Sequence, residues 1–242
     1  MLKIENVELH GWEPGIRGMR NPKNSWKKSD SKFVTTDGDH HDICGNFGPL
    51  YGSYGWKEAV IGENDLNLMT TLRDAGTDHR KFMRMIVVYM DVTAPLYWWK
   101  EYDTYKVGTV TNSCSTMHKI ADKEFTFDDF SHEKLIKSVC MGIQEQHIRI
   151  SPIQALATTI ECLNSYRDLY LQTKDKRYWW QMIQLLPSSY NQRRTVMLNY
   201  EVLANIYKSR RNHKLDEWHT FCDLIESLPY SELITGREEK ND

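Results

Sequence analysis

The sequence predicts a single helix-rich α+β domain with a small sheet. Its 242 residues are a one-domain length and suffice for a sizeable core. The β-branched run from Met83 to Val92 predicts a buried strand. Apolar residues recur at helical spacing through most of the second half, so helix is expected to dominate.

The N-terminal quarter predicts little regular structure. Lys3–Trp12 has partial strand character before the breakers Gly11 and Pro14. Residues 21–54 are rich in Asn, Ser, Lys, Asp and Gly and lack apolar periodicity. We therefore expect a polar insertion there, either a long loop or a partly disordered segment, within one domain over residues 1–242.

Two helices flank the predicted strand. One begins at Asn64 or Asp65 and stops at Ala75-Gly76, where glycine ends a helix well. The other runs from Pro95, a good first helical residue, to about Tyr105. The small, hydroxyl-rich run 107–116 that follows is expected to be a loop.

The second half is expected to be mostly helical. Ser131 and Ser151, the latter followed by Pro152, are good helix N-caps. The expected elements are helices over about 131–147, 152–170, 178–186, 199–211 and 215–228, and a short strand over 195–198.

Composition and charge exclude several classes of protein. Lysine and arginine number 31 against 33 acidic residues, a net charge of −2, so nothing favours binding of nucleic acid or an acidic membrane. No apolar run approaches the roughly 18 residues of a membrane span. Five cysteines without CxxC spacing argue against a disulfide framework or a structural zinc site, and we expect a cytoplasmic protein.

One segment is rich in residue types that bind metals. Neighbouring ligands rarely converge on one ion without support from elsewhere, so a solvated polar loop is favoured over a metal site. The residues are Asp37, Asp39, His40, His41, Asp42 and Cys44.

The polar helix expected over 199–211 carries the most informative side chains. Asn199 and Asn205 are poor choices inside a helix and need a cap or a partner to explain them. Arg210 and Arg211 at the helix end suit the helix dipole, which is the simpler explanation. The functional alternative is bidentate capture of a phosphate by their guanidinium groups.

Aromatic clusters and a hydroxyl-rich run leave further alternatives open. The clusters 97–99 and 178–180 suit stacking on a flavin, base or pterin, but aromatics at helical spacing are more often core. Ser113, Cys114 and Ser115 offer hydroxyls and a thiol to an anion, or are an ordinary loop. The dinucleotide-binding, P-loop, zincin and hydrolase motifs are absent from the sequence.

Taken in order, these elements resemble the flavin-dependent thymidylate synthases, a family of homotetrameric α+β enzymes. Ile16–Trp26 resembles the family's early arginine-bearing segment, and Asp65–Phe82 its helix–Gly–loop–Phe stretch. Val92–Pro95 matches the strand-to-helix junction. Leu186-Pro187 followed by 195–210 is similar to the family's Leu-Pro … Asn-x-Arg … Asn … Arg block.

The resemblance implies a chemistry and a site. In that family FAD, reduced by a nicotinamide cofactor such as NADPH, carries a one-carbon unit from methylenetetrahydrofolate to deoxyuridylate (dUMP), and no protein nucleophile attacks the pyrimidine. By position, Asn199 and Asn205 would lie near the flavin nucleotide and Arg210 would face deoxyuridylate. Arg20 would match the arginine of the first segment.

The sequence departs from the family at its signature, Arg-His-Arg followed after seven residues by Ser. The aligned residues are Thr104, Tyr105 and Lys106, followed after seven residues by Cys114. The family's Asn-x-Arg arginine is Glu201, and the arginine before Leu-Pro is Ile183. The arginines available as replacements are Arg80, Arg84, Arg193, Arg194 and Arg211.

The leading hypothesis is a divergent, FAD-dependent enzyme of this kind that transfers a one-carbon unit to a pyrimidine deoxynucleotide. We expect it to form a homo-oligomer, namely a homotetramer. The alternatives are a non-catalytic nucleotide-binding protein on the same scaffold and an oligomeric scaffold for a protein partner. No residue is assigned to catalysis or to a metal. The candidate cofactor-binding residues are Asn199, Asn205, Tyr105, Lys106 and Arg84. The candidate substrate-binding residues are Arg210, Arg211, Ser113, Cys114, Ser115 and Arg20.

Overall fold

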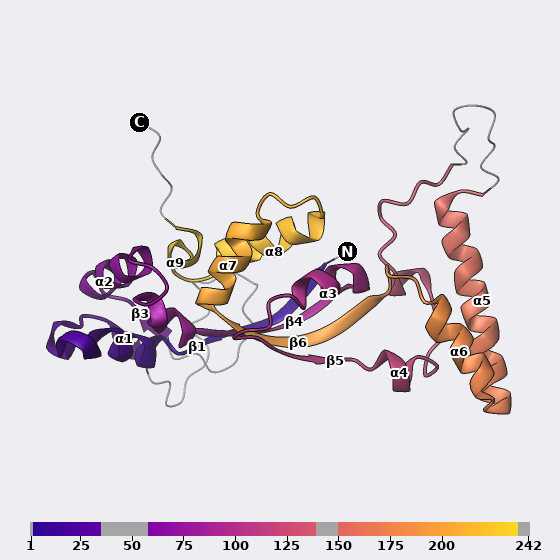
Figure 1. The fold of residues 1–242 in the computed structure, drawn as a ribbon, viewed down its shortest axis with the longest axis horizontal. Coiled ribbons are helices and arrows are strands. Elements are labelled where there is room, and N and C mark those ends of the chain that lie inside the picture. The colour runs from indigo at the N-terminus through magenta and orange to yellow at the C-terminus, as the bar shows by residue number, and fades with distance from the viewer. Residues whose placement is uncertain (1, 35–57, 139–149, 237–242) are drawn as a thin grey trace. The chain divides into compact units, whose positions relative to one another are not determined.

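The structure of the protein is a computed structural model that describes residues 2–34, 58–138 and 150–236 (Figure 1). The prediction of a helix-rich α+β fold with a small sheet is confirmed. The α-helices are α1 (Trp12–Arg20), α2 (Glu63–Asp74), α3 (Leu96–Tyr102), α4 (Thr116–Lys119), α5 (Pro152–Thr173), α6 (Lys176–Leu185), α7 (Tyr200–Arg210), α8 (Asp216–Ser227) and α9 (Glu232–Thr235). Short 3-10 helices are η1 (Asn21–Lys23), η2 (Trp26–Lys28), η3 (Arg80–Arg84) and η4 (Phe127–Asp129).

Strands form two sheets among the described residues. Their bounds are β1 (Lys3–His10), β2 (Lys32–Val34), β3 (Glu58–Val60), β4 (Val87–Pro95), β5 (Val110–Ser113) and β6 (Asn191–Asn199). The larger sheet has the order β1-β4-β6-β5, and β2 pairs antiparallel with β3. The strand expected over 83–92 therefore starts four residues later and ends three residues later, because η3 already occupies residues up to Arg84.

The chain divides into two compact units, so the single domain expected from its length stays a prediction. The first unit comprises residues 93–102 and 113–194, and the second comprises the described parts of 2–92, 103–112 and 195–242. Each unit has buried apolar side chains of its own. Tyr105, Arg210 and the helix that follows β6 belong to the second unit, and Ser113–Ser115 belong to the first.

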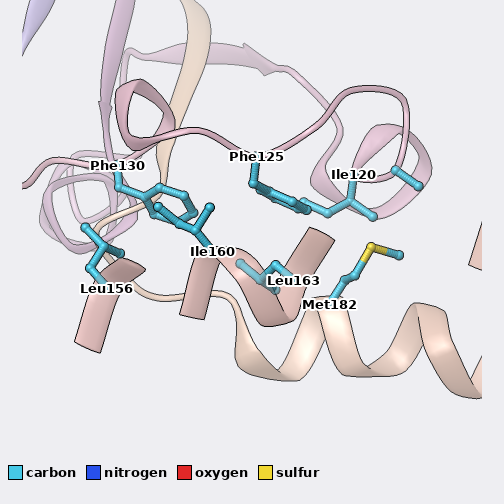
Figure 2. Packing of buried hydrophobic residues seen from close by; sticks show 8 residues of the cluster. Ile120, Phe125, Phe130, Leu156, Ile160, Leu163 and Met182 are labelled. Carbon is cyan, nitrogen blue, oxygen red and sulfur yellow. The ribbon is translucent and has the colours of Figure 1, made fainter. Parts of the chain in front are cut away.

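The core of the first unit lies between α5, α6 and the segment around η4. The side chains of Phe125, Phe130, Ile160 and Leu163 face one another in this cluster, with Met182 of α6 beside them (Figure 2). Helices α5 and α6 pack side by side (Figure 1). Ser151 caps α5 by accepting a hydrogen bond from the Gln154 N–H, as the Ser-Pro start predicts.

The core of the second unit brings α7 against η3, α8 and α9. Leu203 and Ile206 of α7 are fully buried, and so are Trp218 and Phe221 of α8. This spacing of three residues within each helix places both apolar side chains on the inward face. The second unit thus holds α7 firmly by its apolar face, which fixes the direction of its polar side chains.

Four sequence expectations need correction. Residues 107–116 are not all loop, since 110–113 form β5. The described part of the helix expected over 131–147, residues 131–138, contains no helix. Helix α1 was not expected, and the described part of the polar segment, 21–34, forms η1, η2 and β2 rather than a structureless loop.

Candidate functional site

Helix α7 begins at Asn199, whose side chain supplies the expected cap. Its Oδ1 accepts from the Val202 N–H at 3.0 Å, which satisfies one of the free amides of the first turn. Its Nδ2 donates to the Gly108 carbonyl at 3.4 Å. Asn199 is buried and caps the helix, and its position near the flavin, which the family resemblance implies, stays a prediction.

The loop 103–109 packs against α7 at both ends of the helix. Gly108 has a φ of +80°, and a Cβ there would lie 2.9 Å from Asn199 Nδ2. At the other end, the phenol oxygen of Tyr105 accepts from Arg210 Nε at 2.9 Å. The loop that aligns with the family signature therefore contacts the first and last residues of the polar helix. Lys106, between these contacts, is exposed.

The guanidinium of Arg210 is oriented by two aromatic rings. Its central carbon lies 4.8 Å from the ring centroid of Trp218 and 5.6 Å from that of Tyr105. A cation over an aromatic face is attracted by the negative charge of the π system, most strongly for tryptophan. The structure thus brings two of the candidate residues, Tyr105 and Arg210, into direct contact.

Glu201, in the first turn of α7, joins two arginines of η3. Its carboxylate accepts from Arg80 Nε at 3.1 Å and forms a close ion pair with Arg84. Arg80 Nη2 also donates to Asn205 Oδ1 at 3.4 Å. Arg84 and Asn205, both candidate cofactor residues, are therefore linked through Arg80 and the Glu201 carboxylate.

The charges at this cluster shift the pKa of the acid. Burial alone would raise the pKa of Glu201, but the hydrogen bonds from Arg84 and Arg80 outweigh burial and lower it below its ordinary value. The carboxyl is therefore ionised at neutral pH and is paired with both guanidiniums. In the sequence, Glu201 stood out only as the residue that aligns with an arginine of the family. The pattern that could have indicated its ion pairs is the spacing of four residues between Arg80 and Arg84.

Arg20 lies in a different environment from the other candidate cations. Its Nε donates to Asp65 at 2.6 Å, and both side chains are almost fully buried. Burial alone would raise the pKa of Asp65, but hydrogen bonds from Ser29, Ser31 and Arg20 lower it. The ion pair ties α1 to α2, so the structure gives Arg20 a structural partner, and its contact with substrate stays a prediction.

Arg211 lies beside a shallow pocket at the end of α7. The pocket is lined by Arg211, Asn212, His213, His219, Cys222, Asp223 and Glu226. The guanidinium of Arg211 lies 5.9 Å from the Tyr207 ring centroid. The hydrogen bond to Glu226 raises the pKa of Tyr207 to about 12, so this phenol stays protonated.

Ser113, Cys114 and Ser115 stand at the end of β5 in the first unit. The Cys114 N–H donates to the Arg193 carbonyl at 2.9 Å, and Gln192 Nε2 donates to the Cys114 carbonyl at 2.9 Å. Ser115 Oγ accepts from the His118 N–H and caps α4. The side chains of this run are exposed. Because residues of β6 hydrogen-bond to its backbone, the positions of these side chains are restrained.

A cation over an aromatic ring also occurs in the first unit, and sequence reasoning did not find it. Arg194, considered only as a replacement arginine, stacks on Trp99 with 4.2 Å between its central carbon and the ring centroid. Its Nε donates to the Gln192 side chain at 3.0 Å. The two residues are 95 positions apart in the sequence numbering, 194 − 99, and no local pattern marks such a pair.

Metal and membrane sites have no support in the described part of the chain. The described residues contain no group of three or more potential metal ligands in one place. The acidic and histidine-rich cluster at 37–44 lies outside those residues. Of the helices that the structure describes, none has both the length and the apolar character that a membrane crossing requires.

Comparison with known proteins identifies the fold. Neither a family model nor a curated protein matches the sequence. The flavin-dependent thymidylate synthase ThyX from Helicobacter pylori, complexed with FAD and dUMP, matches with a TM-score of 0.60 at 14% identity, over 96% of this chain and 98% of that one. A second structure of that ThyX with FAD and dUMP gives 0.60 at 13% identity, over 96% and 97%.

A related methylase shares the fold as well. The UMP/dUMP methylase PolB from Streptomyces cacaoi, bound with 5-Br UMP, matches with a TM-score of 0.55 at 12% identity, over 94% of this chain and 88% of that one. The chain therefore has the fold of the flavin-dependent thymidylate synthases, and the resemblance drawn from its sequence is confirmed at the level of the fold. Identities this low show the fold alone, because one fold hosts many functions.

Proposed function

We propose that this chain binds FAD and a pyrimidine nucleotide of the dUMP type and transfers a one-carbon unit to the pyrimidine. The observation that carries the proposal is the match over 96% of the chain to ThyX in complex with FAD and dUMP. PolB, bound with 5-Br UMP, widens the nucleotide class to UMP. ThyX holds dUMP and PolB holds 5-Br UMP, which supports a substrate with a uracil-type base and one phosphate.

The residues present fit a flavin dinucleotide. Planar guanidinium groups bind phosphate oxygens well, and Arg80 and Arg84 lie together at the start of α7. The amide of Asn205, which accepts from Arg80, adds a polar group beside them. Bound FAD would supply redox chemistry, with NADPH as hydride source and methylenetetrahydrofolate as one-carbon donor.

The chain itself contributes positioning and electrostatics. Arg210 holds the phosphate of the nucleotide, because its guanidinium is pre-oriented by Tyr105 and Trp218. Arg211, Ser113, Cys114 and Ser115 are proposed as further contacts to the nucleotide, and Lys106 as a cation beside the flavin. We assign no nucleophile, in keeping with a mechanism of orientation and charge stabilisation. A homotetramer is proposed as the assembly.

A non-catalytic nucleotide-binding protein is the second candidate function. The observation that favours it is the contact between Tyr105 and Arg210: the residue aligned with the signature histidine is hydrogen-bonded to the proposed phosphate-binding arginine. Glu201, aligned with a further family arginine, is also paired within the chain. In this alternative the scaffold keeps the nucleotide site and has lost the flavin chemistry.

Visible spectroscopy and ligand titration distinguish the candidates. We expect purified protein to absorb at roughly 450 nm, as bound flavins do, and to bind dUMP in a calorimetric titration. Arg210→Ala should weaken dUMP binding about tenfold, the value of one charged contact, while Lys208→Ala, exposed on the same helix, should not.

Each outcome selects one function. Colourless protein that ignores added FAD but binds dUMP supports the non-catalytic alternative. Protein that binds neither ligand rejects both and leaves an oligomeric scaffold for a protein partner. Unchanged dUMP affinity in Arg210→Ala excludes that residue from the site.

A further inference from the structure

A shared carboxylate holds two arginines in one arrangement. The Glu201 side chain is only 10% exposed, Arg80 is 21% exposed and Arg84 is 46% exposed. The acid thus lies behind and the guanidiniums lie toward solvent. Because η3 supplies both arginines and α7 supplies the acid, the arrangement is fixed by the packing of these two elements.

Each guanidinium retains donors for a ligand. Arg80 uses Nε for Glu201 and Nη2 for Asn205, and Arg84 uses Nε and Nη2 for Glu201. Within the described residues, neither Nη1 has a hydrogen-bond partner. An arginine has five N–H groups in a fixed fork, so an ion pair to a carboxylate leaves room for an anion on the other side.

The local charge favours an anion. Residues 77–84 contain Arg80, Lys81 and Arg84 as cations and Asp78 as an acid. With Glu201, three cations stand against two acids. Hydrogen bonding to Glu201 raises the pKa of Arg84, and the charge of Asp78 acts in the same direction through space, so the Arg84 guanidinium stays charged over the physiological range.

We propose that Arg80 and Arg84, bridged by Glu201, bind the diphosphate of the flavin dinucleotide in place of the arginines missing at residues 104–106 and 201. The proposal rests on the proposed function, which brings FAD to this chain. The arginine that the family carries on α7 is thus replaced by two from η3, linked to α7 through an acid. This substitution leaves the site cationic although Glu201 reverses the charge at its own position.

Equilibrium dialysis of FAD against the full chain tests the assignment. Arg80→Gln and Arg84→Gln should each raise the Kd for FAD about tenfold, because each removes one charged contact to a phosphate. Lys81→Gln is the matched control: it removes the same charge from the same turn, and the exposed Lys81 side chain takes no part in the hydrogen bonds that join Arg80 and Arg84 to Glu201 and Asn205. We expect it to change the Kd by less than about twofold.

The outcomes separate this inference from the proposed function. Two results would overturn the role of Arg80 and Arg84 while leaving FAD binding itself intact. One is a Kd for FAD that is unchanged in both arginine variants, and the other is a Kd that rises equally in Lys81→Gln. Arg84→Lys should also weaken binding, and since Arg84 is half exposed this variant keeps the fold. If the wild-type chain binds no FAD, the proposed function fails, and titration with inorganic pyrophosphate then tests the anion site at Arg80 and Arg84. Pyrophosphate binding that is lost in both arginine variants supports this site. No pyrophosphate binding by the wild type overturns it.

Discussion

Glu201 stands where the family resembled by this sequence carries an arginine, and its carboxylate pairs with Arg80 and Arg84. A carboxylate with a pKa depressed in the folded state stabilises the fold above its unfolded pKa. That stability is lost as the pH falls through the folded pKa. For Glu201 the depression comes from the two arginines, which outweigh the opposing effect of burial. The ion pairs of Glu201 with Arg80 and Arg84 therefore make the stability of the fold sensitive to acid.

Glu201→Gln is expected to lower the free energy of unfolding by about 1–3 kcal/mol at neutral pH, since it leaves a charged hydrogen-bond network incomplete. Below the unfolded pKa of about 4.3 the two proteins should converge, because the wild-type carboxyl is then progressively protonated. Urea unfolding across this range measures both effects, with exposed Glu124→Gln as the control. A constant difference between wild type and Glu201→Gln at every pH would contradict the argument.

Sequence reasoning at the residue scale succeeded where the partner is local. The requirement that Asn199 have a cap or a partner is met by the amide of Val202, three residues away. It did not find the partner of Arg20, because Asp65 is 45 residues distant and nothing local marks the pair. Charged groups choose partners across elements, and a single sequence does not contain those distances.

At the element scale, two differences between sequence and structure have physical reasons. Strand β5 has every residue exposed, so the alternation that marks a half-buried strand is absent. Helix α1 was hidden by Gly11 and Pro14. Gly11 takes a φ of +97° as the N-cap, and Pro14 falls in the first turn, where its missing N–H costs little. The buried amphipathic helices, by contrast, were found because their apolar spacing is long and regular.

The loop 103–109 depends on glycine for its approach to α7. Gly108→Ala combines a positive φ with a Cβ 2.9 Å from Asn199 Nδ2 and 3.1 Å from Val202 Cγ2. Gly76→Ala is a matched control, because Gly76 also has a positive φ (+99°) but nothing lies within 4 Å of a Cβ there. We expect both to destabilise by about 1 kcal/mol through backbone strain, and Gly108→Ala to lose roughly 1 kcal/mol more through crowding.

Chemical denaturation of the two variants measures that difference. Equal losses would mean that Asn199 and Val202 move aside freely and that the loop is not held against the start of α7. A larger loss in Gly108→Ala means that the loop, the Asn199 cap and the first turn of α7 form one packed element.

For the whole molecule, the fold persists at 12–14% identity to ThyX and PolB. Core positions require only apolar side chains of about the right volume, so very different sequences adopt the same fold. Binding positions require particular chemical groups, and the resemblance aligns Thr104, Lys106 and Glu201 with arginines of the family. This is why element order predicted the fold, whereas the ligand chemistry needs a direct test.

Ligand-dependent thermal unfolding supplies that test for the intact protein. A ligand that binds only the folded state stabilises it by about 2.7 kcal/mol at 100 times its Kd, so FAD and dUMP should each raise the Tm. Deoxyuridine, which keeps the base and lacks the phosphate, should raise the Tm much less at equal concentration, because the proposed contact of Arg210 is to the phosphate. A Tm that responds equally to dUMP and deoxyuridine would remove the phosphate from recognition. A Tm that FAD, dUMP and UMP all leave unchanged would mean that the protein has a function other than nucleotide chemistry.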